Sequence, residues 1–484
     1  MNDLKILLAT AEASPFAKTG GLGDVMGGLP VELGRIGDNE AAVFMPKYSC
    51  IPHEYTEKMK YITHFYFPLG WRQAYCGVFE LEMNNYKVYF LDNEQYFKRE
   101  GLYGYGDDIE RFSFLSKAIL EAARQIDFQP DVINCNDWHV ASIPVLLDAY
   151  YRKDPFFRDV RTVMTIHNLK FQGLCGKDEL FELLSLSDYY YTNDKLEFNG
   201  CANIMKGGLV YADRISTVSM TYVEEIKTQY FGENLDGLLS ARSGQLTGIV
   251  NGIDYNTYSP SKDGMIFKKY NTRTVKSGKE HNKNELRREI GLPLYDNTPL
   301  VGVVSRLTEQ KGVDLMRSVM DELLNCGIQM VVLGTGDAQY ENMFKHYAWK
   351  YPDKIKSLIY FSDEMAHKIY AASDMFLMPS KFEPCGLSQL ISFRYGTLPV
   401  VREVGGLKDT VIPYNEYTGE GDGFSFANYN AHEMLFTVKR ATALYKDNRK
   451  VWDSLVTHAM KQDFSWKASA KQYDRMYREL CGIE

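Results

Sequence analysis

The stretch Leu4–Ala9 (LKILLA) and the stretch Lys18–Asp24 (KTGGLGD) decide the fold predicted for this chain. A short apolar run before a glycine-rich turn is typical of a buried β-strand that leads into a helix. The N–H groups and the dipole at such a helix start favour an anion, and Lys18 adds a full positive charge. Gly20 and Gly21 allow positive φ and a close approach of the backbone. We therefore expect a phosphate-bearing ligand at this turn.

A second turn of the same kind lies far along the chain, at Phe382–Leu387 (FEPCGL). Pro384 fixes the turn, and the N–H groups of Gly386 and Leu387 start a helix and can donate to a phosphate. Two such turns predict one ligand held between two halves of the protein.

Length and charge limit the class of protein. A chain of 484 residues is long enough for about two domains. Its 45% hydrophobic and 24% charged residues are typical of a soluble globular protein. With 55 basic and 63 acidic residues the formal charge is −8, which argues against nucleic acid as a partner. An anionic ligand remains compatible, because a pocket can be basic while the surface is acidic.

The sequence predicts a cytoplasmic protein. Its first residues lack the basic and apolar regions of a signal peptide, and no apolar run approaches the ~20 residues of a membrane span. No two of the eight cysteines form a C-x-x-C pair, which predicts reduced thiols and no zinc site. These cysteines stand at positions 50, 76, 135, 175, 201, 326, 385 and 481.

The first half alternates apolar strands with helical patterns, which predicts a parallel sheet covered on both faces. Residues 59–82 alternate aromatic and polar side chains, as a hairpin does. The predicted strands are Leu4–Thr10, Ala41–Pro46, Lys87–Leu91, Val132–Cys135, Thr162–Ile166 and Arg214–Val218. The predicted helices are Asp107–Ile126, Val140–Tyr151 and Thr221–Tyr230.

The polar, lysine-rich stretch from Ser259 to about Asn297 indicates a linker or the entry to a new domain, after which the alternation restarts. We expect an N-terminal Rossmann-like domain over 1–255 and a C-terminal one over 256–464, with a helix at 465–484 returning to the first. Predicted elements of the second half are the strands Leu300–Val304, Met330–Leu333, Met375–Met378 and Leu398–Val401, and the helices Val313–Cys326 and Gly386–Tyr395.

Every polar motif follows a predicted strand end, where open α/β sheets bind ligands. In the first half, Asp137 and Trp138 suit a sugar site, or else a helix cap beside a packed tryptophan. His167 is either catalytic or structural, and Asn251 either contacts a ligand or forms a tight turn.

In the second half, Arg306 and Lys311 leave one strand end together and suit a diphosphate, or else form a solvated pair. Glu383 contacts a sugar, or else caps the following helix. The chain has neither the P-loop spacing nor the dinucleotide-binding fingerprint with its acidic residue.

These motifs together resemble the bacterial glycogen synthases and plant starch synthases over nearly the whole chain. The motifs, in family order, are KTGGLGD (18–24), NDWH (136–139), IHN (166–168), NGID (251–254), SRLTEQKG (305–312) and FEPCGLSQL (382–390). The resemblance implies a GT-B fold, with two Rossmann-like doubly wound domains facing a deep cleft. It also implies a hexosyltransferase of glycogen biosynthesis, which moves glucose from ADP-glucose to the non-reducing end of an α-1,4-glucan with retention.

The resemblance also assigns roles to individual residues. It makes Lys18, with the Gly20-Gly21 turn, a donor phosphate site, to which Arg306, Lys311, Gly386 and Leu387 contribute from the second domain. It places Glu383 on the sugar, His167 and Asn251 beside the glucose, and Asp137 in the acidic part of the first domain's cleft. The catalytic set is then Glu383, His167, Arg306, Lys311 and Asp137.

The wider retaining GT-B pattern has a second glutamate eight residues after the first, where this chain has Ile391. Glycogen and starch synthases generally lack it too, which argues against a mechanism with two such acids. No metal or cofactor is expected, because lysine and arginine neutralise the leaving group. Phe361 is the candidate for stacking on the nucleotide base, within the stretch 360–363 (YFSD), which matches the family poorly. UDP-glucose therefore stays open as the donor beside ADP-glucose.

Three other functions stay open at this point. A sucrose or trehalose-phosphate synthase shares the fold and the second-domain cations. A NAD-dependent oxidoreductase is disfavoured by the missing fingerprint, and an inactive glucan-binding protein by the intact charged set. The expected partners are the nucleotide-sugar donor and the glucan acceptor, with neither nucleic acid nor membrane, and the sequence does not predict an oligomeric state.

Overall fold

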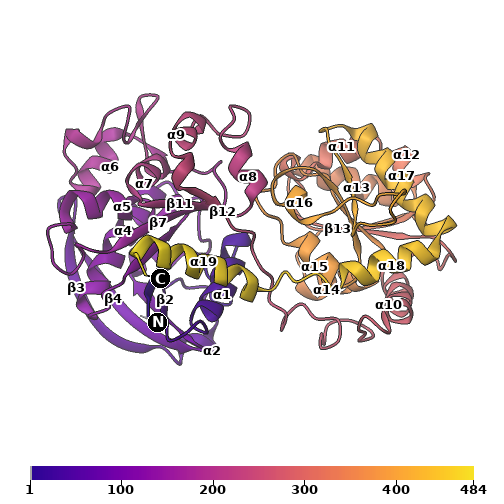
Figure 1. The fold of residues 1–484 in the computed structure, drawn as a ribbon, viewed down its shortest axis with the longest axis horizontal. Coiled ribbons are helices and arrows are strands. Elements are labelled where there is room, and N and C mark those ends of the chain that lie inside the picture. The colour runs from indigo at the N-terminus through magenta and orange to yellow at the C-terminus, as the bar shows by residue number, and fades with distance from the viewer. Residues whose placement is uncertain (1–2, 484) are drawn as a thin grey trace. The chain divides into compact units, whose positions relative to one another are not determined.

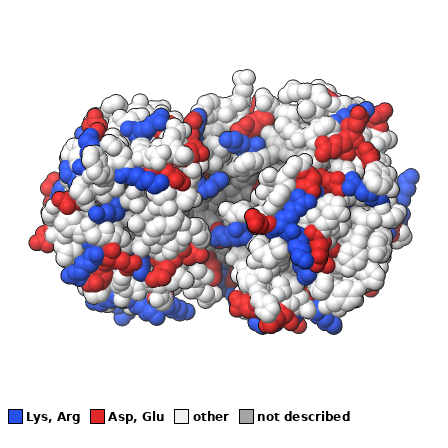
Figure 2. All heavy atoms as spheres, turned by 180° about the vertical axis from the view of Figure 1, so that it is seen from behind, with Lys and Arg blue, Asp and Glu red and all other residues white. Residues whose placement is uncertain are grey.

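A computed structural model describes residues 3–483, which divide into two compact units (Figure 1). Unit 1 runs to Gly252 and includes the chain from Trp466 onward, and unit 2 is Ile253–Ser465. Over most of the face shown in Figure 2, basic and acidic side chains are interspersed. All eight cysteines are free thiols. Among the helices of residues 3–483, none combines the length and the apolar run that a membrane crossing requires.

Unit 1 is built on a nine-stranded sheet with the order β12-β11-β7-β6-β1-β2-β5-β4-β3. Its strands are parallel except for the hairpin β3–β4 and the β4–β5 pair, which are antiparallel. The sheet strands are β1 (Lys5–Ala9), β2 (Glu40–Pro46), β3 (Lys60–Leu69), β4 (Arg72–Met83), β5 (Tyr86–Asp92), β6 (Val132–Asn136), β7 (Arg161–Ile166), β11 (Arg214–Thr217) and β12 (Leu246–Gly248). A small antiparallel sheet contains β8 (Leu174–Cys175), β9 (Glu197–Phe198) and β10 (Cys201–Asn203).

Helices cover both faces of this sheet, as the apolar runs predict. Ile6, Leu7 and Leu8 in β1 have no exposed surface, although their side chains alternate between the two faces. The helices are α1 (Gly21–Leu33), α2 (His53–Thr56), α3 (Glu94–Phe97), α4 (Asp108–Gln125), η1 (Trp138–Val140), α5 (Ser142–Leu146), η2 (Leu147–Tyr151), α6 (Lys177–Leu184), η3 (Asp188–Tyr190), α7 (Ile204–Tyr211), α8 (Met220–Glu225), α9 (Asp236–Ala241), η4 (Ser243–Gln245) and α19 (Trp466–Cys481).

The C-terminal helix α19 packs against α1 within unit 1 (Figure 1). Gly28 of α1 provides the space, since a Cβ at this position would lie 2.1 Å from Cδ1 of Trp466. Trp466 is only 4% exposed, and Tyr473 and Tyr477 further along α19 are fully buried. The aromatic side of α19 is therefore part of the core of unit 1.

Unit 2 contains a six-stranded parallel sheet with the order β15-β14-β13-β16-β17-β18. Its strands are β13 (Leu300–Val304), β14 (Gln329–Leu333), β15 (Ile355–Leu358), β16 (Met375–Met378), β17 (Leu398–Arg402) and β18 (Phe424–Phe426). Its helices are α10 (Val275–Ile290), η5 (Glu309–Lys311), α11 (Val313–Ser318), α12 (Met320–Leu324), α13 (Ala338–Lys350), α14 (Asp363–Ala372), α15 (Ser388–Arg394), α16 (Gly405–Thr410), α17 (Ala431–Asp447) and α18 (Arg449–Ala459). All predicted strands of both halves are present to within a residue or two.

Of the two alternatives for residues 259–297, the entry to a new domain is correct, because unit 2 begins at Ile253, and the linker is wrong, because most of the second half of this stretch is the helix α10. Two lysines of α10 are buried: Nζ of Lys279 donates to Oγ1 of Thr397 at 2.7 Å, and Nζ of Lys283 lies 3.0 Å from Oδ2 of Asp374. Their long apolar stems cross the core while their ammonium groups find partners. The lysine-rich helix α10, whose composition is typical of a solvent-exposed segment, therefore places two of its lysines in the interior.

Three predicted helices are shorter or broken. The helix expected over Thr221–Tyr230 ends at Glu225, and the one over Val140–Tyr151 continues from α5 as the π-helix η2. The helix expected over Val313–Cys326 is divided at Val319, whose φ of −133° departs from helical geometry.

The packing of α1 on α19 gives a stability prediction. Gly28→Ala should lower the free energy of unfolding by about 1–3 kcal/mol, because the new methyl group displaces Trp466. Urea unfolding followed by tryptophan fluorescence measures it. Gly237→Ala is the matched control, since Gly237 lies in helix α9 with open space around it. Equal stability of the two variants would contradict the packing argument.

Candidate active site

Within each unit, the predicted site residues follow the carboxyl ends of parallel strands, which meet at one edge of the sheet. In unit 1, Lys18 follows β1, Asp137 follows β6, His167 follows β7 and Asn251 follows β12. In unit 2, Arg306 and Lys311 follow β13, and Glu383, Gly386 and Leu387 follow β16. Each sheet thus gathers one group of candidate residues.

The glycine-rich turn of unit 1 leads directly into α1, which begins at Gly21. Nζ of Lys18 lies 2.6 Å from Oδ1 of Asp24, so the lysine has a carboxylate partner in the first turn of the helix. The expected positive φ is absent: Gly20 is extended at φ −159°, and Gly21 is not in the left-handed region. Open space surrounds the Cβ position of both glycines, which leaves room for a ligand near the backbone.

Glu12 holds this turn in place, and the sequence analysis missed it. Its Oε2 accepts the N–H of Thr19 at 2.7 Å and that of Gly20 at 3.2 Å. Its Oε1 accepts the hydroxyl groups of Thr19 and Tyr103 at 2.7 and 2.6 Å. The carboxylate is 4% exposed, so four hydrogen bonds compensate for its burial. The sequence signal that could have identified Glu12 is an acidic residue three positions after the end of the buried strand β1.

Asp137 occupies a strained and buried position. Its φ is 60°, its side chain is 9% exposed, and its Oδ1 accepts the N–H groups of His167 at 2.8 Å and Asn168 at 3.3 Å. Burial raises the pKa of Asp137 to about 7, the two backbone donors oppose this rise, and the charge of Glu12 adds to it. The alternative of a helix cap is wrong for this side chain, which makes no capping bond to η1.

His167 is held as a neutral ring. Its Nε2 lies 2.9 Å from Oδ1 of Asn136, and burial lowers the pKa of His167 to about 3. Because a carboxamide oxygen only accepts, Nε2 carries the proton. A neutral imidazole fixed in one tautomer can donate or accept a hydrogen bond but does not supply a full charge.

Trp138 belongs to the core rather than to a stacking surface. Its ring packs edge-on against Phe112 at 5.3 Å and is 9% exposed. A Cβ at Gly173 would lie 2.3 Å from Cε3 of Trp138, so backbone covers that side of the indole. The packed-tryptophan alternative is therefore correct, and Trp138 leaves no face for a sugar.

Asn251 has a buried acceptor without a partner. The side chain is 5% exposed, and its Oδ1 makes no hydrogen bond within residues 3–483. An unsatisfied buried carbonyl costs roughly 1–3 kcal/mol, so a hydroxyl or N–H group of a ligand would be favoured there.

In unit 2, Lys311 and Glu383 form an ion pair. Nζ of Lys311 lies 2.6 Å from Oε2 of Glu383, which also accepts the hydroxyl of Ser380 at 3.1 Å. Glu383 is 6% exposed. The capping alternative for Glu383 is wrong, because α15 is preceded by Leu387 and has no side-chain cap.

Arg306 differs from Lys311, since its exposed guanidinium has no partner among the described residues. The loop that carries both cations is tied to the loop of Glu383 by the N–H of Lys381, which donates to the carbonyl of Gln310 at 2.9 Å. The N–H groups of Gly386 and Leu387 also have no acceptor within residues 3–483. Positive φ is found at Gly386, at 75°. This edge therefore offers one free arginine and two free N–H groups beside the ion pair.

A second pair of glycines supports Glu383 and was also missed from the sequence. The N–H of Gly406, at the start of α16, donates to the carbonyl of Glu383 at 3.1 Å. A Cβ at Gly405 would lie 2.0 Å from that same carbonyl oxygen. The sequence signal that could have identified this support is the pair Gly405-Gly406 just after the strand β17.

Two further expectations concern the base and a metal. Phe361 is 83% exposed, so its ring is available, and its stacking on a base stays a prediction. Within residues 3–483, no group of three or more histidine, cysteine or acidic side chains is arranged to hold a metal ion. The independence of metal likewise stays a prediction.

The comparisons with known proteins agree with the two α/β units. A model of the starch synthase catalytic domain matches residues 5–241, and a model of glycosyl transferases group 1 matches residues 283–452. A glycogen synthase of Lachnospira eligens is 54% identical over 98% of this chain and 99% of its own length. The catalytic domain of starch synthase IV from Arabidopsis thaliana, solved with ADP and acarbose, is 32% identical with a TM-score of 0.93, over 99% of this chain and 100% of that chain.

A sucrose-phosphate synthase from Thermosynechococcus elongatus has a TM-score of 0.62 at 18% identity, with 99% of each chain covered, and shares the fold alone. The two α/β units and the two matched family models define a glycosyltransferase of the GT-B class. With half of its residues identical to a glycogen synthase over nearly its full length, the chain belongs to the family of glycogen and starch synthases.

The raised pKa of Asp137 gives a pH-dependent stability prediction. The folded protein keeps on Asp137 a proton that the unfolded chain releases near pH 4, so the contribution of Asp137 to stability falls as the pH rises from about 4 to 7. Asp137→Asn keeps an oxygen for the two backbone donors and removes this titration. Its stability relative to wild type should grow by up to ~4 kcal/mol between pH 4 and pH 8, measured by urea unfolding. A gain equal at both pH values would contradict the assignment.

Proposed function

We propose that this protein transfers glucose from ADP-glucose to the non-reducing end of an α-1,4-glucan, with retention of the anomeric configuration. The observation that carries the proposal is the Lys311–Glu383 pair beside the unpaired Arg306, at the carboxyl edge of the second sheet. Family membership supports the reaction. The ADP and acarbose bound to starch synthase IV support the donor and the glucan-like acceptor.

The cations of unit 2 are assigned to the diphosphate. An ammonium group has three donors, and Glu383 takes one from Lys311, which leaves others for a phosphate oxygen. Arg306 presents a planar fork that suits two oxygens of one phosphate. The free N–H groups of Gly386 and Leu387 add two neutral donors.

Glu383 is assigned to the sugar rather than to the phosphates. Its carboxylate is fixed by Lys311 and by Ser380, and its main-chain carbonyl accepts the N–H of Gly406. A carboxylate held so firmly can accept hydrogen bonds from ring hydroxyls without reorganising.

The residues of unit 1 are assigned to the same donor and to the acceptor. Lys18, with the open backbone at Gly20 and Gly21, is assigned to the donor phosphates, and Asn251 offers its unpaired oxygen to a sugar hydroxyl. His167 is assigned to a position beside the glucose, and Asp137 to the acidic part of the site in unit 1. The proposal requires residues from both units to contact one donor molecule.

The chemistry follows from these charges. As the bond from C1 to the phosphate oxygen breaks, its electron pair moves to the β-phosphate, where Arg306 and Lys311 stabilise the growing charge. The acceptor hydroxyl forms the new bond to C1 on the same face, and its proton passes to the departing phosphate oxygen. The residues described offer no second carboxylate in the position eight after Glu383, which is the buried Ile391. A same-face displacement therefore fits this chain better than a double displacement.

The compartment and partners are proposed on the same basis. Eight free thiols fit a reducing cytoplasm, and the mixture of both charge signs in Figure 2 does not favour nucleic acid. The expected partners are thus the donor and the glucan.

One assay tests the reaction and the donor together. Purified protein is incubated with glycogen and either ADP-glucose or UDP-glucose in the presence of EDTA, and release of the nucleoside diphosphate is measured. We expect ADP release at full rate and an α-1,4 linkage in the product by NMR. Loss of activity in EDTA would overturn the metal-free mechanism, and faster UDP release would overturn the choice of donor.

The diphosphate assignment gives a separate prediction. Lys311→Ala should lower kcat by about a hundredfold and weaken ADP binding in calorimetry, since it removes a charge from the leaving group. Lys381→Ala is the matched control, because its ammonium group lies 2.7 Å from Glu309 instead. Unchanged ADP affinity in Lys311→Ala would reject the role on the diphosphate.

A further inference from the structure

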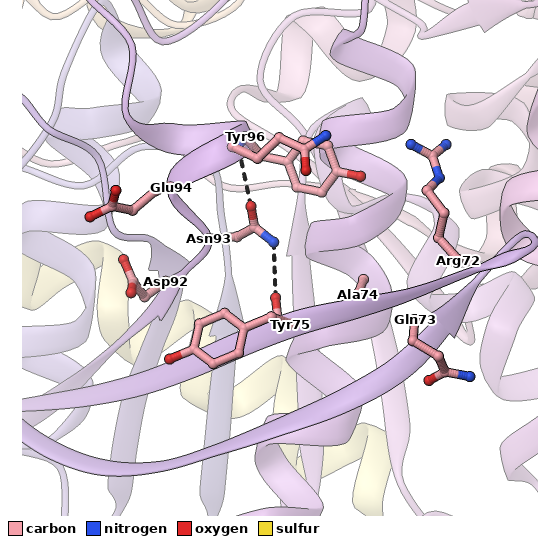
Figure 3. Close-up of a pocket in the computed structure, with 9 residues that line it drawn as sticks. Arg72, Gln73, Ala74, Tyr75, Asp92, Asn93, Glu94 and Tyr96 are labelled. Atoms are coloured by element: carbon pink, nitrogen blue, oxygen red, sulfur yellow. Dashed lines mark hydrogen bonds between the residues drawn. The ribbon is translucent and has the colours of Figure 1, made fainter.

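A cavity of about 340 Å³ beside β4 in unit 1 has charged side chains in its wall (Figure 3). Each of them has a partner of opposite charge: Arg72 pairs with Glu110 at 2.9 Å, Asp92 with Lys47 at 3.2 Å, and Glu94 with Lys98 at 3.1 Å. Among the described residues of this wall, no charge is left free to recognise a ligand.

Lys279 of helix α10 in unit 2 is different. It is 7% exposed, and no acidic side chain within residues 3–483 forms an ion pair with it. Its Nζ donates to Oγ1 of Thr397 at 2.7 Å and lies 3.1, 3.2 and 3.4 Å from the carbonyl oxygens of Tyr395, Ala371 and Tyr370. All four acceptors are neutral, so the burial of this ammonium group is costly.

The three carbonyl groups lie at the C-terminal ends of two helices. Tyr370 and Ala371 belong to the last turn of α14, and Tyr395 is the C-cap of α15. Carbonyl groups in the last turn of a helix have no partner within that helix, and this end of the helix favours a cation. Lys279 therefore joins the ends of α14 and α15, both of which lie near α10 (Figure 1).

Asp263 joins the same two helices a second time. Its Oδ2 accepts the hydroxyl of Tyr395 at 2.5 Å and lies 2.7 Å from Nδ1 of His367, which belongs to α14. The side chains of Asp263 and His367 are both buried. The stretch 259–297 thus supplies two buried charged side chains that bridge α14 and α15.

The opposite ends of α14 and α15 carry candidate contacts for a nucleotide. Phe361 stands directly before Ser362, the N-cap of α14, and Gly386 and Leu387 stand directly before α15. Both helices follow strands of the parallel sheet, so these two starts lie at its carboxyl edge. Because short helices bend little, a fixed separation at one end of the two helices limits their separation at the other.

Stability alone does not account for the burial of Lys279. Burial lowers the pKa of Lys279 to about 7, the charge of Asp374 opposes this fall, and those of Lys283 and Arg449 add to it. An apolar side chain of similar length would avoid the cost of burying the charge.

The carbonyl groups at the helix ends also have other donors. The hydroxyl of Thr397 donates to the carbonyl of Tyr370 at 2.6 Å, and that of Tyr270 donates to the carbonyl of Tyr395 at 2.8 Å. These two carbonyl groups would therefore keep a partner without Lys279. What the ammonium group adds is a tie between the ends of α14 and α15.

We propose that Lys279 is a positioning residue for the donor nucleotide. By joining the C-terminal ends of α14 and α15, it sets the separation of their N-terminal ends. Phe361 before one helix then meets the base, while Gly386 and Leu387 before the other meet the phosphates of the same ADP group. The identity of the nucleotide rests on the proposed function.

Calorimetry of ADP binding to the full chain tests this role. Lys279→Met should raise the Kd for ADP about tenfold, and the KM for ADP-glucose by a similar factor, because the two sets of contacts no longer fit one nucleotide. The KM for glycogen should stay within about twofold of wild type, since the acceptor is not assigned to α14 or α15. The Kd for inorganic pyrophosphate should rise less than about threefold, because a ligand without a base needs only the phosphate contacts.

Lys276→Met is the matched control, because Lys276 lies in the same helix with its side chain 69% exposed. It should bind ADP as wild type does. Val438→Ala, at a fully buried residue of α17, is the control for lost stability. Its midpoint of urea unfolding should fall while its Kd for ADP stays unchanged. Tyr270→Phe removes the other hydrogen bond to the carbonyl of Tyr395 and should raise the Kd for ADP about two- to threefold.

An ADP affinity of Lys279→Met equal to that of wild type would overturn the positioning role. Equal losses of affinity for ADP and pyrophosphate would overturn it too, as would a loss in Val438→Ala that matches the loss in Lys279→Met. If Lys279→Met does not fold, unchanged ADP affinity in Tyr270→Phe overturns the role. If ADP binding depends on Lys279 but wild type transfers no glucose, the positioning role stands and the proposed reaction fails.

Discussion

Parallel strand order is the constraint on which the rest of this structure depends. A parallel strand must be reached by a crossover, so every segment that leaves a carboxyl end emerges at the same edge of its sheet. Residues as far apart in sequence as Glu12 and Asn251 thereby share one edge in unit 1. In unit 2 the same rule brings Lys311 within 2.6 Å of Glu383 across 72 positions of sequence. The topology of each sheet thus determines which residues lie close enough to act together.

The candidate site keeps several features that a protein selected only for stability would lose. Asp137 combines a positive φ with burial, and Asn251 has a buried oxygen without a partner. Each such feature costs on the order of 1–3 kcal/mol. The fold is therefore less stable than it could be at positions where a bound ligand would supply the missing interactions.

Much of the fold was predictable because buried parallel strands appear as continuous apolar runs, as in Leu300–Val304. The helix α10 was not, since burial of Lys279 and Lys283 depends on acceptors that lie about 90 and more positions away. For the site, the residues at strand ends could be named, but their partners could not. The position of Glu12 after a buried strand was visible in the sequence, but neither its hydrogen bonds to the glycine-rich turn nor the pairing of Lys18 with Asp24 was. Motifs identify candidate site residues, while the groups that position them depend on three-dimensional contacts.

The place of α19 in the core of unit 1 has a consequence for the order of events during translation. Unit 2 is complete in the nascent chain at Ser465, before the ribosome has delivered Trp466. Until then the groove beside Gly28 is uncovered, and the aromatic ring that fills it is missing. The segment that is synthesised first therefore completes its core last, after all of unit 2 has been synthesised.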